Sequence, residues 1–225
     1  MESNKIGNYR WVVCALLFFA TTINYIDRQV IGLLKPTLEE EFHWTEVDYS
    51  YIVMAFASMY ALGYIIFGGI VDKVGTKVGY AISVFVWSVA SVLHAVVRTT
   101  LGFGVVRGLL GLSESGNFPA AVKAVAEWFP KKERALATGI FNSGTSIGAV
   151  VAPIIVPLVL GSYGWKEAFW ITGSLGFIWL IFWFIFYEIP SKQKRLKKPE
   201  YDYIHSDPDA TETPVKIKWI RLLGL

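Results

Sequence analysis

Six stretches of about 20 mainly apolar residues dominate this 225-residue sequence. A helix rises 1.5 Å per residue, so about 20 residues cross a hydrocarbon core of ~30 Å. The runs are apolar on every face and lack the alternating ~10-residue pattern of an outer-membrane β-barrel. The sequence therefore predicts an all-α integral membrane protein whose six transmembrane helices lie near Trp11–Leu34, Tyr49–Val71, Tyr80–Val97, Leu101–Trp128, Ala135–Leu160 and Ala168–Tyr187.

The overall composition agrees with a membrane protein. Hydrophobic residues make up 54% of the chain and charged residues only 17%, against roughly 25% charged residues in an average soluble protein. The net charge of +3 comes from lysines and arginines in the loops. We therefore expect no nucleic-acid partner.

Metal-binding and catalytic patterns do not stand out in the sequence. The single cysteine, Cys14, excludes an intramolecular disulfide and a thiolate metal cluster. The histidines lie outside any metal-ligand spacing, and neither a His-Glu-x-x-His pair nor a nucleophile–base pair appears within a span. We therefore expect no enzyme activity, no catalytic residue, no metal site and no cofactor.

Basic residues in the loops predict the orientation, because cytoplasmic loops are enriched in Lys and Arg. The loops on the side of the N-terminus hold most of them, whereas the opposite loops hold only Lys35, Arg98 and Lys166. Both termini should therefore be cytoplasmic. The predicted organisation is a cytoplasmic N-terminus at 1–10, a six-helix membrane domain at 11–188 and a cytoplasmic linker at 189–225, in which Lys216–Leu225 reads as the start of a seventh span.

Four ionisable residues lie deep in the predicted spans: Asp27 and Arg28 in the first, Arg107 and Glu114 in the fourth. A charge at membrane depth costs at least ~2.5 kcal/mol on insertion scales, so each indicates a function or a partner. One interpretation is a polar cavity in which the planar fork of Arg28 binds a carboxylate and Asp27 and Glu114 carry protons. The other is that Asp27–Arg28 and Arg107–Glu114 are fixed ion pairs that only hold helices together.

Two other patterns indicate packing. Lys123 and Glu127 are four residues apart near the end of the fourth span, which predicts an ion pair along one helix. Gly144 and Gly148 have the spacing that lets two membrane helices approach closely.

The segment after the second span resembles a known family signature. It reads Gly68-Gly69-Ile70-Val71-Asp72-Lys73-Val74-Gly75-Thr76-Lys77 and matches the G-x-x-x-D-[RK]-x-G-x-[RK] motif between the second and third helices of the major facilitator superfamily. In that family the loop acts as a cytoplasmic latch. The resemblance implies gating roles for Gly68, Asp72, Lys73, Gly75 and Lys77.

Further motifs resemble the anion:cation symporter branch of that superfamily. They are Asn24-Tyr25-Ile26-Asp27-Arg28, Arg107-Gly108 followed by Glu114, Phe118-Pro119-Ala120 and Glu127-Trp128-Phe129-Pro130. The resemblance extends from Trp11 to Ile204, and within the branch it points to bacterial hexuronate transporters of the inner membrane. It implies substrate contacts from Tyr25, Arg28 and Tyr60 with Asn24 and Thr145, proton coupling through Asp27 and Glu114, and coupling of Arg107 to Glu114.

The function that the resemblance implies is symport of a sugar acid, such as glucuronate or galacturonate, driven by the proton gradient. Thr145 stands where aldonate carriers use a glutamine, which favours a hexuronate. The alternatives are a carrier for an aldonate, an aldarate or an organophosphate, and a membrane fragment that does not transport.

The expected partners follow from the same resemblance. They are the sugar-acid anion, the proton, membrane lipid and a missing carboxyl-terminal half, because carriers of the family have twelve spans in two six-helix halves. The chain would then be the amino-terminal half. Its six spans would form two inverted three-helix repeats.

Overall fold

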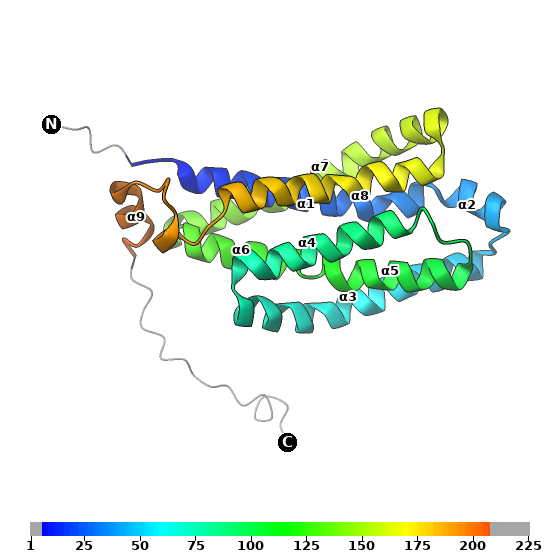
Figure 1. Ribbon diagram of the computed structural model, residues 1–225, viewed down its shortest axis with the longest axis horizontal. Coiled ribbons are helices and arrows are strands. Elements are labelled where there is room, and N and C mark those ends of the chain that lie inside the picture. The colour runs from blue at the N-terminus through cyan, green and yellow to red at the C-terminus, as the bar shows by residue number, and fades with distance from the viewer. Residues whose placement is uncertain (1–5, 208–225) are drawn as a thin grey trace, which may run out of the picture.

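The computed structural model describes residues 6–207, and all regular structure in this part of the chain is helical (Figure 1). The predicted all-α fold is therefore confirmed. The helices are α1 (Tyr9–Leu33), α2 (Lys35–Phe42), α3 (Glu46–Val74), α4 (Thr76–Leu93), α5 (Thr100–Glu114), α6 (Asn117–Trp128), α7 (Lys131–Tyr163), α8 (Trp165–Phe186), the short 3-10 helix Pro190–Lys192 and α9 (Lys198–Ile204).

Five helices are individually long and apolar enough to cross a membrane, namely α1, α3, α4, α7 and α8. They correspond to five of the six predicted spans. The predicted span Leu101–Trp128 is instead divided into α5 and α6, of 15 and 12 residues. Ser115 and Gly116 between them keep right-handed helical dihedrals, and α6 continues from α5 along the length of the bundle (Figure 1). The fourth crossing is therefore made by two helical segments.

The division between α5 and α6 has a steric and a hydrogen-bonding cause. Pro119 has no N–H to donate to the carbonyl of Ser115, so the regular helical ladder stops there. A Cβ atom on Gly116 would lie 2.6 Å from the Ser83 hydroxyl and 2.7 Å from the ring of Phe67. Close packing against α3 and α4 thus requires glycine at this position, and the break leaves Glu114 as the last residue of α5.

Helices α1 and α7 also pack closely, as the glycine spacing predicts. A Cβ atom on Gly144 would lie 2.6 Å from the Phe18 carbonyl oxygen, and one on Gly148 would lie 2.6 Å from the Thr22 carbonyl oxygen. The missing side chains let the backbone of α1 lie directly against α7. This contact fixes the position of the segment of α1 that carries the polar residues.

The exposed surface of the bundle is apolar, as expected for helices in contact with lipid. Ile65 is 80% exposed, Leu101 79% and Leu158 67%. Buried aromatic residues fill the interior, including Trp87 and, towards the end where α9 lies, Trp128 and Trp183. A second cluster around Phe103 and Phe169 fills the opposite end.

The first and last described residues lie at the same end of the bundle (Figure 1), as an even number of crossings requires. We call this end the α9 end. Arg10 of α1 binds Glu133 of α7 at 2.8 Å and Glu200 of α9 at 3.2 Å, so α9 is tied to the bundle. The predicted start of a seventh span, Lys216–Leu225, lies outside the described residues.

Candidate functional site

The centre of the candidate site is an ion pair between α1 and α5. The Nε atom of Arg28 donates to Glu114 Oε2 at 3.1 Å, and a terminal nitrogen of the same guanidinium lies 3.0 Å from that oxygen. The Glu114 side chain is fully buried, whereas the Arg28 side chain is 23% exposed. The pair thus presents its cation, and not its anion, to an incoming ligand.

This pairing differs from both ion pairs that the sequence suggested. Within residues 6–207, the close partner of Glu114 is Arg28 rather than Arg107, and Asp27 forms no ion pair with Arg28. Neighbouring residues on a helix point about 100° apart. Asp27 and Arg28 consequently face different helices.

Three aromatic rings surround the guanidinium of Arg28. Its central carbon lies 4.8 Å from the ring centre of Tyr25, 4.6 Å from that of Tyr60 and 5.2 Å from that of Phe56. A cation within about 6 Å of a ring centre is attracted by the ring's quadrupole. The rings therefore hold the guanidinium in place, and the tyrosine hydroxyls add hydrogen-bonding groups beside it.

Phe56 and Tyr64 also belong to this cluster, although they were not identified from the sequence. Phe56 stacks on Tyr60, with ring centres 5.6 Å apart, and the Tyr60 hydroxyl donates to that of Tyr64 at 3.4 Å. All three lie on α3 at intervals of four residues, which places them on one face. That spacing from Tyr60 was the signal that could have found them.

Arg107 reaches the same cluster from α5 without contacting an acid. It is 5% exposed, and one terminal nitrogen donates to the carbonyl oxygen of Arg28 at 2.8 Å. Its Nε and other terminal nitrogen have no hydrogen-bond partner among the described residues. No close acid in the part of the chain that the structure describes compensates the charge of this buried guanidinium, which is costly. The guanidinium adds positive potential beside the Arg28–Glu114 pair.

Asp27 lies in a separate polar site between α1 and α4. Its Oδ1 accepts a hydrogen bond of 3.0 Å from the Ser91 hydroxyl, and the residue is 1% exposed. The other oxygen, Oδ2, has no hydrogen-bond partner in the described part of the chain. Ser91 was not identified from the sequence, because a single serine in an apolar helix carries no distinctive pattern.

Asn24 and Thr145 are placed differently relative to Arg28. The Oδ1 atom of Asn24 accepts a hydrogen bond of 3.4 Å from Arg28, one turn along α1. The Thr145 hydroxyl donates to the Asn142 carbonyl of its own helix, α7, at 2.8 Å. Asn24 thus belongs to the Arg28 cluster in this conformation, whereas the Thr145 hydroxyl is engaged within its own helix.

The last turn of α3 is fastened to α6 at the α9 end. The Nζ atom of Lys123 donates to Asp72 at 2.9 Å and to the Val71 carbonyl at 3.0 Å. Gly75 has a φ of +83°, which favours glycine. Lys73 is exposed, and a Cβ atom on Gly68 would meet nothing within 4 Å, so neither position is constrained by packing.

The predicted ion pair between Lys123 and Glu127 is wrong. Lys123 binds Asp72, and Glu127 instead accepts hydrogen bonds of 2.6 Å from the hydroxyls of Thr76 and Tyr187. An exposed pair four residues apart on a helix contributes only about 0.3–0.5 kcal/mol. Contacts between helix ends easily outweigh it.

A second connection at the α9 end joins Lys77 of α4 to Glu188, just beyond α8. The Nζ–Oε2 distance is 2.9 Å. The hydrogen bond from Lys77 holds the pKa of Glu188 below its ordinary value. Burial and the nearby Glu127 carboxylate raise the pKa of Tyr187, so its hydroxyl remains a hydrogen-bond donor.

Comparison with known proteins places the chain in a family. Residues 17–223 match the family model described as the Major Facilitator Superfamily, and the chain therefore belongs to the major facilitator superfamily, a family of membrane transporters. It is an integral membrane protein, and the expectation that it is not an enzyme agrees with this membership.

Curated relatives cover nearly all of the chain. It is 38% identical over 206 residues to a galacturonate transporter of Dickeya chrysanthemi, an alignment covering 92% of this chain and 60% of that protein. It is 40% identical over 206 residues to a hexuronate transporter of Escherichia coli (strain K12), covering 92% and 48%. A D-galactonate transporter of E. coli O6:H1 is 33% identical, covering 91% and 47%. The chain spans about half the length of these relatives.

A solved structure shares the fold. A bacterial homolog of the human lysosomal transporter Spinster, in an inward-facing and unoccupied conformation, superposes with a TM-score of 0.71 at 22% identity. The match covers 82% of this chain and 44% of that chain. The helical arrangement is thus that of major facilitator superfamily transporters.

Proposed function

We propose that this chain is the amino-terminal, six-helix half of a proton-coupled symporter that carries a hexuronate, such as galacturonate or glucuronate, across the bacterial inner membrane. The observation that carries the proposal is the partly exposed guanidinium of Arg28, paired with buried Glu114 and surrounded by Tyr25 and Tyr60. This arrangement suits a ligand with one carboxylate and several hydroxyl groups.

The relatives support a sugar acid as the substrate class. Transporters named for galacturonate and hexuronate are 38% and 40% identical to the chain, and one named for D-galactonate is 33% identical. The chain covers about half of each relative, and a carrier of this family holds its substrate between two halves. The rest of the substrate site would therefore come from a second six-helix half.

Coupling would arise from competition for Arg28. In the structure Glu114 forms an ion pair with the guanidinium of Arg28. A substrate carboxylate that takes over the two N–H groups now directed at Glu114 Oε2 would release Glu114. A buried carboxylate left without its cation is stabilised by taking up a proton. Substrate and proton would then be bound together, and neutral Glu114 would permit the change of conformation.

Asp27 and Arg107 would complete the proton site. Asp27 is buried with one free oxygen and supplies a second proton-binding carboxylate. Arg107 binds the backbone of Arg28 and supplies positive potential that stabilises the ionised form of Glu114. No cofactor is required, since the proton gradient drives the cycle.

The latch residues and the orientation form the last part of the proposal. Asp72–Lys123 and Lys77–Glu188 would hold the α9 end together in one state and separate in another. Loop charge supports a cytoplasmic location for both termini. Gly68, Lys73 and Gly75 belong to this latch by resemblance.

Uptake of labelled galacturonate tests the proposal. Cells that lack their own hexuronate uptake would express the chain alone, or together with the carboxyl-terminal half of the E. coli hexuronate transporter. We expect uptake with both halves, loss on collapse of the proton gradient, and competition by glucuronate. Competition by galactonate but not by glucuronate would favour the aldonate alternative. Failure of any organic anion to enter would favour a fragment that does not transport.

A further inference from the structure

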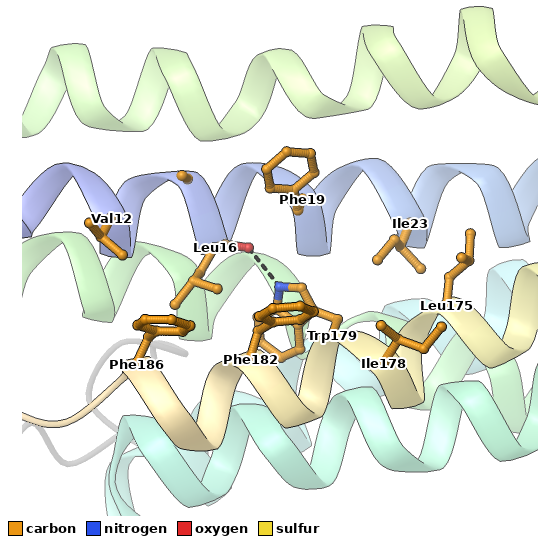
Figure 2. A pocket seen from close by; sticks show the side chains of 10 residues that line it. Val12, Leu16, Phe19, Ile23, Leu175, Ile178, Trp179, Phe182 and Phe186 are labelled. Carbon is orange, nitrogen blue, oxygen red and sulfur yellow. Dashed lines mark hydrogen bonds between the residues drawn. The ribbon is translucent and has the colours of Figure 1, made fainter.

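An apolar groove of about 400 Å³ runs between α1 and α8 on the outer surface of the bundle (Figure 2). Phe19 and Ile178 on its two sides are 56% and 51% exposed. Trp179 closes the groove from below, because its indole N–H donates to the Leu16 carbonyl of α1 at 2.8 Å. The groove is therefore a fixed feature of the packing of α1 against α8.

The length of the groove matches one leaflet of a bilayer. Val12 and Phe186 lie at one end, and Ile23 and Leu175 lie at the other (Figure 2). Val12 and Ile23 are eleven positions apart on α1, which at 1.5 Å per residue is about 16 Å. One leaflet contributes half of a hydrocarbon core of ~30 Å. An acyl chain lying along the helices would fill such a groove.

Positive charge lies directly at the α9 end of the groove. The guanidinium of Arg195 stacks on the ring of Phe186, with its central carbon 4.9 Å from the ring centre. Gln193 donates to the Phe186 carbonyl at 2.9 Å and holds the intervening segment against the end of α8. From Ile189 to Pro199 the sequence contains five basic residues and no acidic one.

These cations differ from three other basic residues at the same end. Arg10, Lys77 and Lys123 each bind a carboxylate within 4 Å. Among residues 6–207, Lys194 and Arg195 form no ion pair. An unpaired cation at the mouth of an apolar groove, with a second one next to it in the sequence, is complementary to an acyl chain with a negatively charged headgroup.

We infer that the groove between α1 and α8 binds an anionic phospholipid, with one acyl chain against Phe19 and Phe182 and the phosphate at Arg195 and Lys194. A second protein half would not occupy it. Phe19 and Arg28 are nine positions apart, which at about 100° per residue places them on opposite faces of α1. The rest of a carrier that closes over Arg28 therefore covers the other side. The inference does not depend on the transported substrate.

Native mass spectrometry of the purified chain tests this site. The apparent Kd would be measured for phosphatidylglycerol and for phosphatidylcholine with identical acyl chains. We expect phosphatidylglycerol to bind at least tenfold more tightly. The double variant Lys194→Gln/Arg195→Gln should lose about tenfold in affinity for phosphatidylglycerol and approach the phosphatidylcholine value.

The matched control is the double variant Lys73→Gln/Lys132→Gln. It removes two charges at the α9 end of the bundle, from residues that do not line the groove. It should bind phosphatidylglycerol within twofold of the unmodified chain. An equal loss in both double variants would overturn the inference, because it would show diffuse attraction to the whole basic end.

A second pair of variants tests the groove without changing any charge. Ala15 lines the groove, so Ala15→Trp should fill it and weaken phosphatidylglycerol binding at least tenfold. Phe19→Ala, which removes one exposed wall, should weaken it severalfold. Full binding in both variants would overturn the inference. So would a dimer of the chain that Ala15→Trp dissociates in the absence of lipid, since a second copy would then be the occupant.

Discussion

Arg28 donates from Nε to the buried Glu114 at 3.1 Å and, in the same conformation, remains 23% exposed. One cation thus satisfies an internal carboxylate and is accessible to an external one. A ligand carboxylate that takes over the two N–H groups now directed at Glu114 Oε2 would displace Glu114 from them. The first two predictions follow from this competition.

Replacing Glu114 by glutamine should separate substrate binding from proton coupling. The glutamine side chain keeps a hydrogen-bonding oxygen but cannot exchange a proton. In the complete carrier we expect Glu114→Gln to bind substrate within about threefold of the unmodified protein and to retain exchange, while accumulation driven by the proton gradient falls at least tenfold. Exchange and gradient-driven uptake in proteoliposomes measure both. Undiminished accumulation would remove Glu114 from the coupling step.

Arg28→Lys should weaken substrate binding although it keeps the charge. Lysine cannot form two parallel hydrogen bonds and stacks less well between Tyr25 and Tyr60. A hydrogen bond to a charged group contributes about 1.5–3 kcal/mol, so we expect the Kd to rise at least tenfold. Equilibrium binding of galacturonate in the complete carrier measures this, with Lys166→Gln, at the opposite end, as the control. Equal Kd values for Arg28→Lys and the control would exclude a forked contact.

Much of the fold follows from the sequence because long apolar runs determine where a chain can cross a membrane. The exception, the division of Leu101–Trp128 into α5 and α6, depends on Pro119 together with the tight approach of Ser83 and Phe67 to Gly116. A proline in an apolar run is compatible with a continuous kinked helix. Only the neighbouring helices decide where the helix ends.

The site residues were identifiable, but their pairing was not. Asp27, Arg28, Arg107 and Glu114 stand out because charge is rare in membrane spans. Which of them pair depends on the rotation of α1 against α5. The structure selects Arg28 with Glu114 and directs Asp27 towards Ser91. Lys123 binds Asp72 instead of Glu127 for the same reason, since contacts between helices are invisible to spacing along one helix.

Enlarging Gly144 should destabilise the contact between α1 and α7. A Cβ atom at this position would meet the Phe18 carbonyl at 2.6 Å, so Gly144→Val should lower the free energy of unfolding by about 1–3 kcal/mol through overpacking. Thermal unfolding of the chain in detergent measures the change. The control Gly139→Val lies on the same helix, where a Cβ meets nothing within 4 Å. If the free energy of unfolding falls by a comparable amount in both variants, the effect comes from helix propensity alone.

The Lys77–Glu188 ion pair should make stability at the α9 end depend on pH in the acid range. Lys77 lowers the pKa of Glu188 in the folded protein, so the unfolded chain takes up the proton first as pH falls. The stabilisation is therefore complete well above the ordinary glutamate pKa of about 4.3 and is lost as pH falls through the lowered value. Both side chains are partly exposed, at 27% and 32%, which limits the effect to less than about 1 kcal/mol.

We expect Lys77→Gln to have a lower Tm than the unmodified chain at pH 6 and the same Tm at about pH 3. The control Lys73→Gln changes an exposed residue on the preceding helix and should leave the difference in Tm between pH 6 and pH 3 unchanged. If the Tm of Lys77→Gln is still lower than that of the unmodified chain at pH 3, Lys77 acts through packing rather than charge.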